Sequence, residues 1–215
     1  MISWVFGYGS LVWRPAFPYL EKRPAAVHGW LRRFWQASPD HRGTPEAPGR
    51  VVTMVAEAAA VTWGMAYALD PAYAARTLAE LDHREKAGYL RLMLPLDFGE
   101  GPTKERGLVY VAGPDNPNFI GGDTVEAMAA HVRGAAGPSG PNPEYVLELD
   151  AALRAMGRPD PHVAAIAALV RSFRPELSAV QVKEAVLNGA VAIGAEGGDR
   201  AHAFQALLAA REWDG

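Results

Sequence analysis

Alternating apolar and polar residues dominate the first third of the chain and predict β-strands. A short apolar run at 2–6 predicts a first strand. Residues 25–37 predict a long strand with a bulge at Gly29, because a glycine inside a strand often marks one. Two further strands are expected at about 51–56 and 60–69. The amino-terminal part is therefore predicted to be mainly β-structure.

Prolines separate these strands. The segment 14–24 carries three prolines and predicts an extended loop. The polar segment 38–50 also carries three prolines and predicts a long, stiff loop. Long ordered loops in compact domains are often functional, so the second segment is a candidate for the wall of a site.

A helix is predicted between Asp70 and Gly88. Asp70 is a good capping residue, and Pro71 suits the first helical position. Gly88 favours the end of the helix on its carboxyl-terminal side. This helix is the most informative one in the chain, because of what its inner face carries.

The inner face of that helix ends in a carboxylate. Its positions are spaced i, i+4, i+7 and i+11, and they are Ala74, Leu78, Leu81 and Glu85. Glu80 falls off this face and is expected to be solvated. Burial of the Glu85 carboxyl would raise its pKa toward the range useful for proton transfer. The alternative is a buried ion pair with a nearby Arg or Lys, and spacing alone leaves both open.

The rest of the chain alternates between strands and helices. Strands are expected at 89–96 and 107–112. Asp123 and Glu126 have the spacing of a capping box ahead of a helix at about 124–134.

Two more helices are predicted beyond these. Asn142 is expected to cap one of them, with Pro143 at its first position and Tyr145 on its inner face. Asp160 precedes another helix at roughly 161–173. From its position alone, Tyr145 is either a substrate contact or a core residue with its hydroxyl at the surface, and the sequence pattern leaves both interpretations open.

The character of the chain changes near residue 175. Two Ala-rich helices are expected at 178–188 and 199–212. The predicted organisation is a domain at 1–174 and a helical extension at 175–215. The role of the extension and the oligomeric state stay open.

Composition narrows the classes of function. The chain has 215 residues, of which 49% are hydrophobic, which suits one globular domain with an appendage. A net charge of −3 without a basic stripe argues against nucleic acid or a membrane as partner. The chain shows neither a long apolar run nor a signal peptide, so a cytoplasmic location is expected. The absence of cysteine excludes disulfides and thiolate chemistry.

The most distinctive stretch is 4–13, where an apolar strand breaks into Gly-Tyr-Gly-Ser. Gly7 and Gly9 offer φ values that other residues resist and allow a ligand to approach the backbone. Ser10 adds a hydroxyl beside backbone N–H groups, so the turn is a candidate anion cradle. An ordinary Gly-rich β-turn is the alternative. A dinucleotide fingerprint fails, because the third glycine is missing.

Other kinds of site are poorly supported. Ser10 lacks the Gly-x-Ser-x-Gly context of a nucleophile. The six histidines show no helical pair of metal ligands, so no metal site is expected. The loop at 38–50 carries Arg42 and Arg50, which either bind an anion or are solvated. A carboxylate with anion-binding groups suits proton transfer on a zwitterionic substrate.

Several motifs together resemble one family. Four segments spread over about residues 3–173 carry the resemblance: Phe-Gly-Tyr-Gly-Ser-Leu-Val-Trp-Arg-Pro, His-Arg-Gly-Thr-Pro-Glu-Ala-Pro-Gly-Arg, Leu-Asp-His-Arg-Glu-Lys-Ala-Gly-Tyr and Gly-Pro-Ser-Gly-Pro-Asn-Pro-Glu-Tyr. In this order they resemble the ChaC-type γ-glutamylcyclotransferases. The resemblance implies an α+β fold with a mixed β-barrel-like core and flanking helices. It also implies cleavage of glutathione to 5-oxoproline and cysteinylglycine without a cofactor.

The resemblance also implies roles for particular residues. The family's substrate cradle maps onto Tyr8, Gly9, Ser10 and Leu11. The catalytic glutamate maps onto Glu85, and a substrate-contacting tyrosine maps onto Tyr145. We add Arg42 as a hypothesis, since it lies in the matching loop.

The mechanism expected from this resemblance is an intramolecular ring closure. Glu85 would take a proton from the γ-glutamyl amine and later donate one to the leaving amine. The oxyanion would be stabilised by N–H groups of the turn or by Tyr145. Two alternatives stay open: cyclotransfer on other γ-glutamyl amino acids or amines, and a protein that binds a γ-glutamyl ligand without turnover.

Overall fold

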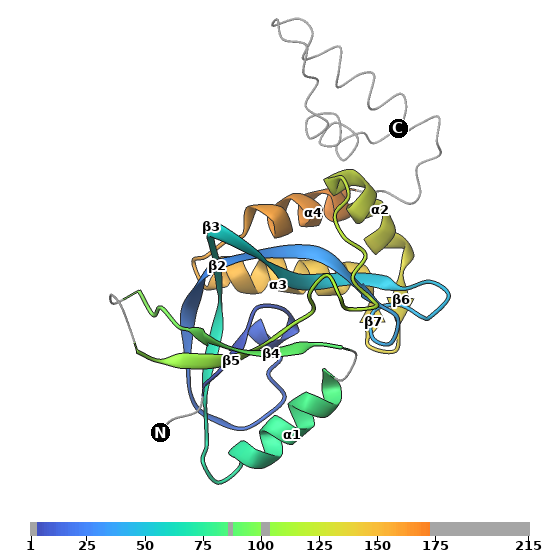
Figure 1. The fold of residues 1–215 in the computed structure, drawn as a ribbon. Helices are drawn as coiled ribbons and strands as arrows, with labels where there is room; N and C mark the ends of the chain where they lie inside the picture. The colour runs from blue at the N-terminus through green and yellow to red at the C-terminus, as the bar shows by residue number, and fades with distance from the viewer. Residues whose placement is uncertain (1–3, 86–87, 100–103, 173–215) are drawn as a thin grey trace, which may run out of the picture.

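The structure is a computed structural model that describes residues 4–85, 88–99 and 104–172 (Figure 1). The strands of the described part are β1 (Trp4–Gly7), β2 (Tyr19–Ser38), β3 (Gly49–Leu69), β4 (Leu90–Pro95), β5 (Arg106–Val111), and the short pair β6 (Ala136–Gly137) and β7 (Gly140–Pro141). The helices are the single-turn η1 (Ser10–Val12), α1 (Ala74–Arg84), α2 (Val125–Gly134), α3 (Asn142–Ala155) and α4 (Pro161–Ser172). The helices expected at 178–188 and 199–212 lie outside the described residues, and the division at 174/175 stays a prediction.

The described strands form a mixed sheet in the order β2-β3-β1-β5-β4, with β1 and β5 parallel and the other pairs antiparallel. Among the described residues, one isolated bridge joins β2 to the segment just after β4, through reciprocal backbone hydrogen bonds of 2.7 and 2.9 Å between Ala26 and Asp97. The barrel-like core is therefore a mixed sheet whose edges meet at one point, and the described residues do not close it into a barrel.

The loop expected at 14–24 is too long, because residues 19–24 already belong to β2. Pro24 is tolerated in this strand because β2 is an edge strand. The N–H of Ala26, two residues on, points outward to Asp97, so the proline nitrogen also lies on the outer side of the ladder. No hydrogen bond to β3 is lost there.

The bulge expected at Gly29 is confirmed. The register of β2 and β3 shifts between His28 and Trp30, and Gly29 has a φ of +79°. The strands expected at 51–56 and 60–69 are one continuous strand, β3. The residues between them lie opposite this irregularity, so the break in the apolar pattern marks a ladder defect and no chain reversal.

The helices predicted within the described residues are present, and the starts of the first three differ from the prediction. Asp70 caps a turn, since its Oδ1 accepts from Ala72 N at 2.9 Å, and α1 begins only at Ala74. The capping box expected before α2 is wrong, because the Thr124 hydroxyl accepts from Ala127 N at 3.1 Å.

The start of α3 also differs from the prediction. Asn142 is its first helical residue and does not cap it. The side chain instead accepts from the backbone N–H of Arg50 and donates to the carbonyl of the same residue, at 2.6 and 2.8 Å. Helix α4 follows Asp160 as expected, and the Asp160 side chain caps it by accepting from the N–H groups of His162 and Val163.

The helices lie on two sides of the sheet (Figure 1). Helices α2 and α3 pack against β3, and α4 packs against β2, over a large apolar cluster. Helix α1 lies on the other side over a small cluster that includes Leu81 and Leu108. None of the helices in the described part of the chain is long and apolar enough to cross a membrane.

Candidate active site

A cavity of about 310 Å³ opens where β1 breaks, and it brings together the residues proposed from the sequence. Its wall contains Tyr8, Gly9, Ser10, Leu11, Arg42, Glu85 and Tyr145. They come from the turn after β1, the β2–β3 loop, the end of α1 and the first turn of α3. The cavity therefore joins the two sides of the molecule.

The Gly-Tyr-Gly-Ser turn needs its glycines for space. A Cβ on Gly7 would lie 2.4 Å from the Cβ of Leu11, which is a clash. A Cβ on Gly9 would lie 2.9 Å from Tyr145 Oη and 3.2 Å from Val52 Cγ2. Gly9 has a φ of −115°, and Gly7 also lacks a positive φ, so neither glycine adopts the left-handed region. Glycine is needed at both positions because atoms of other residues of the protein leave no room for a Cβ.

Glu85 lies at the cavity wall just beyond α1, where it is the C-cap and its N–H donates to Leu81 O at 2.8 Å. The Glu85 side chain is only 17% exposed. Glu80 is solvated as expected and pairs with Arg76 across one turn of α1. The inward direction predicted for Glu85 is confirmed, although its backbone is no longer helical.

Arg84 connects the acid to the turn. Its Nη2 donates to Ser10 Oγ at 2.6 Å, and its Nε lies 3.2 Å from Glu85 Oε1. Burial raises the pKa of Glu85, while the charges of Arg84 and His41 lower it and Asp40 adds a further rise. The two alternatives considered for Glu85 are thus both realised, since it is a partly buried acid with an ion-pair partner.

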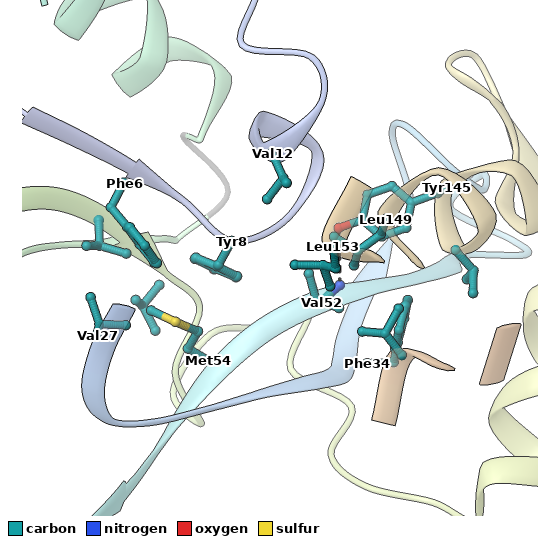
Figure 2. Packing of buried hydrophobic residues seen from close by; sticks show 14 of the residues in the cluster. Phe6, Tyr8, Val12, Val27, Phe34, Val52, Met54, Tyr145, Leu149 and Leu153 are labelled. Atoms are coloured by element: carbon teal, nitrogen blue, oxygen red, sulfur yellow. Dashed lines mark hydrogen bonds between the residues drawn. The ribbon is translucent and has the colours of Figure 1, made fainter. Parts of the chain in front are cut away.

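Tyr145 projects from the first turn of α3 toward β3 (Figure 2). Its ring is buried against Trp13 and Phe34, with centroids 5.4 and 6.2 Å away. Its Oη accepts a long hydrogen bond of 3.4 Å from Val52 N. Burial raises the pKa of Tyr145 to about 12, so the hydroxyl keeps its proton at neutral pH. The expectation of a hydroxyl at the protein surface is wrong, because the hydroxyl lies inside the cavity wall.

The two loop arginines have different surroundings. Arg42 is buried in the cavity wall, and its Nη1 donates to Pro141 O at 3.0 Å and lies 3.4 Å from Glu144 Oε2. Arg50 is buried outside the wall, with its Nη1 donating to Phe34 O at 3.0 Å. Solvation is therefore wrong for both, and only Arg42 remains a candidate for the site.

Sequence reasoning missed several residues that shape the cavity. Arg84 is next to Glu85 in the chain, and that adjacency was an available signal. Arg32 is fully buried, donates from Nε to Tyr8 O at 2.9 Å and pairs with Asp160 at 2.9 Å. It also donates to Trp63 O. No local pattern indicates this role, because the partners of Arg32 are distant in the chain.

Three tyrosines surround the acid, and of these only Tyr8 was proposed from the sequence. Tyr8, Tyr89 and Tyr110 line the same cavity, and the charge of Glu85 contributes to raising the pKa of each. Burial is the larger cause in all three. The described residues contain no group of three or more His, Asp or Glu side chains placed to hold a metal ion.

Comparison with known proteins agrees with this architecture. The sequence model of the ChaC-like protein family matches residues 3–173. The glutathione-specific gamma-glutamylcyclotransferase 1 of Danio rerio is 40% identical over 184 residues, covering 82% of this chain and 93% of that protein. The Homo sapiens protein of the same name is 40% identical over 179 residues, covering 80% of each chain.

A solved structure supports the same relationship. The crystal structure of the yeast gamma-glutamyl cyclotransferase specific to glutathione matches with a TM-score of 0.74 and 29% identity. The match covers 82% of this chain and 98% of the yeast chain. The α+β γ-glutamylcyclotransferase fold expected from the sequence is thereby confirmed. Since the family model spans well over half of its residues, this chain belongs to the ChaC-like protein family.

Proposed function

We propose that this protein is a γ-glutamylcyclotransferase that cleaves glutathione to 5-oxoproline and cysteinylglycine. The observation that carries the proposal is the contact of Arg84 with both Ser10 Oγ and Glu85 Oε1 within one cavity. This contact supports the proposal because it joins a partly buried carboxylate to the turn that is the candidate anion cradle. The relatives from Danio rerio and Homo sapiens bear the name of this activity.

The γ-glutamyl end of the substrate carries a carboxylate and an ammonium on the same carbon atom. The carboxylate fits against Ser10, Arg84 and the N–H groups of the turn, where positive charge is concentrated. The ammonium then lies next to Glu85, because it is only two bonds from that carboxylate. Holding the chain in this folded form brings the amine to its own γ-carbonyl, which favours ring closure.

Proton transfer by Glu85 follows from this placement. Glu85 accepts a proton from the ammonium, and the freed amine attacks the γ-carbonyl carbon. The bond to the cysteinyl nitrogen then breaks as Glu85 returns a proton to that nitrogen. In total the ammonium loses two protons and the leaving nitrogen gains two, so no water or other reactant is consumed.

Tyr145 is the best-placed group to stabilise the oxyanion of the intermediate. Its oxygen already accepts from Val52 N, which leaves the hydroxyl proton available to a ligand, and no acceptor for that proton lies among the described residues. Its raised pKa keeps it a donor. Removing one such donor typically costs on the order of 10²–10³ in rate.

A direct assay of 5-oxoproline tests the proposal. The purified protein is incubated with glutathione or with γ-glutamyl-alanine. In each case 5-oxoproline and the released cysteinylglycine or alanine are quantified by mass spectrometry. Release of 5-oxoproline from glutathione, with slower release from the dipeptide, is the expected result. Faster release from γ-glutamyl-alanine would reassign the substrate, and binding without release would support a non-catalytic γ-glutamyl-binding protein.

A further inference from the structure

Three arginines line the cavity, and two of them are already engaged. Arg42 binds Pro141 O and Glu144, and Arg84 binds Ser10 and Glu85. The third, Arg14, is exposed in the cavity wall. Among the described residues no side chain forms a hydrogen bond or ion pair with its guanidinium. A cation without a counterion in a substrate cavity is available for an anionic part of the ligand.

Arg14 lies one helical turn from the cradle. Its backbone N–H donates to Ser10 O at 2.8 Å, which is the i to i+4 spacing of a turn. Side chains four residues apart on such a turn have Cβ atoms about 5–6 Å from each other. Arg14 therefore starts close to Ser10, whose hydroxyl already accepts from Arg84.

The segment that follows Arg14 is held in a fixed direction. Ala16 has a φ of +56°, and no other non-glycine residue in the described part of the chain has a positive φ. Pro15, between them, restricts the backbone further. Ala16 also lines the cavity. A strained residue at a cavity wall persists only where its surroundings impose it, so the backbone that carries Arg14 is constrained.

The substrate of the proposed function has a second carboxylate that needs a partner. Glutathione carries one carboxylate on its glutamyl end and another at the carboxyl terminus of the leaving dipeptide. The cysteinyl and glycyl residues of the leaving dipeptide, fully extended, span at most about 7 Å. A long side chain that begins beside the cradle can cover that distance. In the proposed placement Arg84 holds the glutamyl carboxylate, and Arg42 is paired with Glu144, which leaves Arg14 for the second carboxylate.

We infer that Arg14 binds the terminal carboxylate of the leaving dipeptide and so selects a tripeptide over shorter γ-glutamyl compounds. In a γ-glutamyl dipeptide the carboxylate is one residue nearer to the cradle, about 3.5 Å short of this position. The inference rests on the proposed function, since it assumes that the glutamyl end occupies the turn. Arg14 is then a specificity-determining residue that touches the substrate away from the reacting atoms.

A comparison of two substrates with two enzymes tests the inference. The substrates are glutathione and its analogue with a carboxamide in place of the glycine carboxylate. The enzymes are the wild type and Arg14→Gln, with Arg76→Gln as a control for loss of an exposed arginine far from the cavity. Arg14→Gln should lower kcat/KM for glutathione about 10- to 100-fold, mainly through KM, because a hydrogen bond to a charged group is lost.

The carboxamide analogue provides the decisive contrast. Its kcat/KM should be low with the wild type and unchanged by Arg14→Gln, because the charge that Arg14 recognises is already absent. Arg14→Lys should restore part of the activity toward glutathione. Equal losses for both substrates, or no loss for either, would overturn the assignment.

A binding measurement separates this inference from the proposed function. If the wild type releases no 5-oxoproline, the proposed reaction fails. The same comparison is then made by titration calorimetry in the Glu85→Gln background, where no turnover is required. Weaker binding of glutathione but not of the analogue in Arg14→Gln upholds the inference, and equal binding refutes it.

Discussion

Helices α1 and α3 both bring a residue to the cavity, but they are packed very differently. Helix α3 buries Tyr145, Leu149 and Leu153 among other residues in the large apolar cluster (Figure 2). Helix α1 buries only Thr77 and Leu81 and lies over the small cluster. The proposed oxyanion donor is thus on the well-packed side, and the proposed acid/base is on the lightly packed side.

This difference in packing predicts that the stability of the fold and the catalytic rate depend on different helices. Regions with few buried contacts open at low free energy and often carry function, whereas core elements open only with global unfolding. Helix α1 presents Glu85 at its carboxyl end, where the chain leaves the helix and the carboxylate faces the cavity. Changes on α1 should therefore affect catalysis first, and changes on α3 away from the cavity should affect stability first.

The largest effect is expected for Glu85→Gln. Losing a positioned proton carrier should lower the rate of 5-oxoproline release by on the order of 10²–10⁴. The fold should survive, because glutamine has nearly the same shape and the side chain is not in the large cluster. Circular dichroism checks the fold. Glu80→Gln on the exposed face of α1 is the control and should keep normal activity; near-normal turnover by Glu85→Gln would remove Glu85 from the mechanism.

Tyr145→Phe should have the next largest effect. It removes the proposed donor but keeps the ring between Trp13 and Phe34, so kcat should fall by about 10²–10³ while KM changes little. Steady-state kinetics with glutathione measures both constants. Tyr73→Phe, at an exposed position before α1, is the matched control. An unchanged kcat would transfer the oxyanion role to the N–H groups of the turn.

Truncating one leucine on each helix tests the comparison most directly. Leu149→Ala should lower the free energy of unfolding by about 2–5 kcal/mol, as expected for a fully buried leucine. Leu81→Ala should cost less stability, because its cluster is small, but it should lower kcat more, because the Leu81 side chain packs the last turn of α1, next to Glu85, against that cluster. Urea denaturation ranks the two variants by loss of unfolding free energy, and kinetics on the folded fraction ranks them by loss of kcat. The reverse order in both would contradict the separation proposed here.

The smallest of these effects is a shift in pH dependence on replacing Arg84 with Met, and it comes in addition to the weaker binding expected when the glutamyl carboxylate loses its arginine. Glu85 must be deprotonated to accept a proton, so activity falls as the pH drops through its raised pKa. The charge of Arg84 lowers that pKa, and its removal should raise the pKa further. The acidic limb of kcat/KM should therefore move to higher pH. Arg76→Met, on the exposed face of α1, should leave the acidic limb in place. An unmoved limb in Arg84→Met would show that the charge of Arg84 does not set the pKa of Glu85.

Local features were predictable because they depend on near neighbours in the chain. The bulge at Gly29 and the inward direction of Glu85 follow from strand alternation and helical spacing. The composition of the Gly-Tyr-Gly-Ser turn identified a candidate cradle. The reason for its glycines was not predictable, because the atoms that exclude a Cβ from Gly9 belong to Val52 and Tyr145, which are far away in the chain.

Contacts between distant segments required the tertiary structure. Arg32 reaches the carbonyl of Tyr8 from 24 residues away, and Asn142 holds Arg50 from 92 residues away. In sequence the same residues fit a polar strand position and a helix cap. A side chain's local propensity describes which backbone it favours, but not which buried donor or acceptor it will meet after folding.

The sequence by itself determined most of the order of strands and helices, the candidate acid and the linked motifs of the ChaC-like family. Only the tertiary structure decided that Ser10, Arg84 and Glu85 form one connected group, and that Tyr145 keeps its hydroxyl inside the cavity. The physical reason is that charge and hydrogen bonding act through space. Their effect on a pKa or a ligand depends on burial and distance, which a linear pattern does not contain.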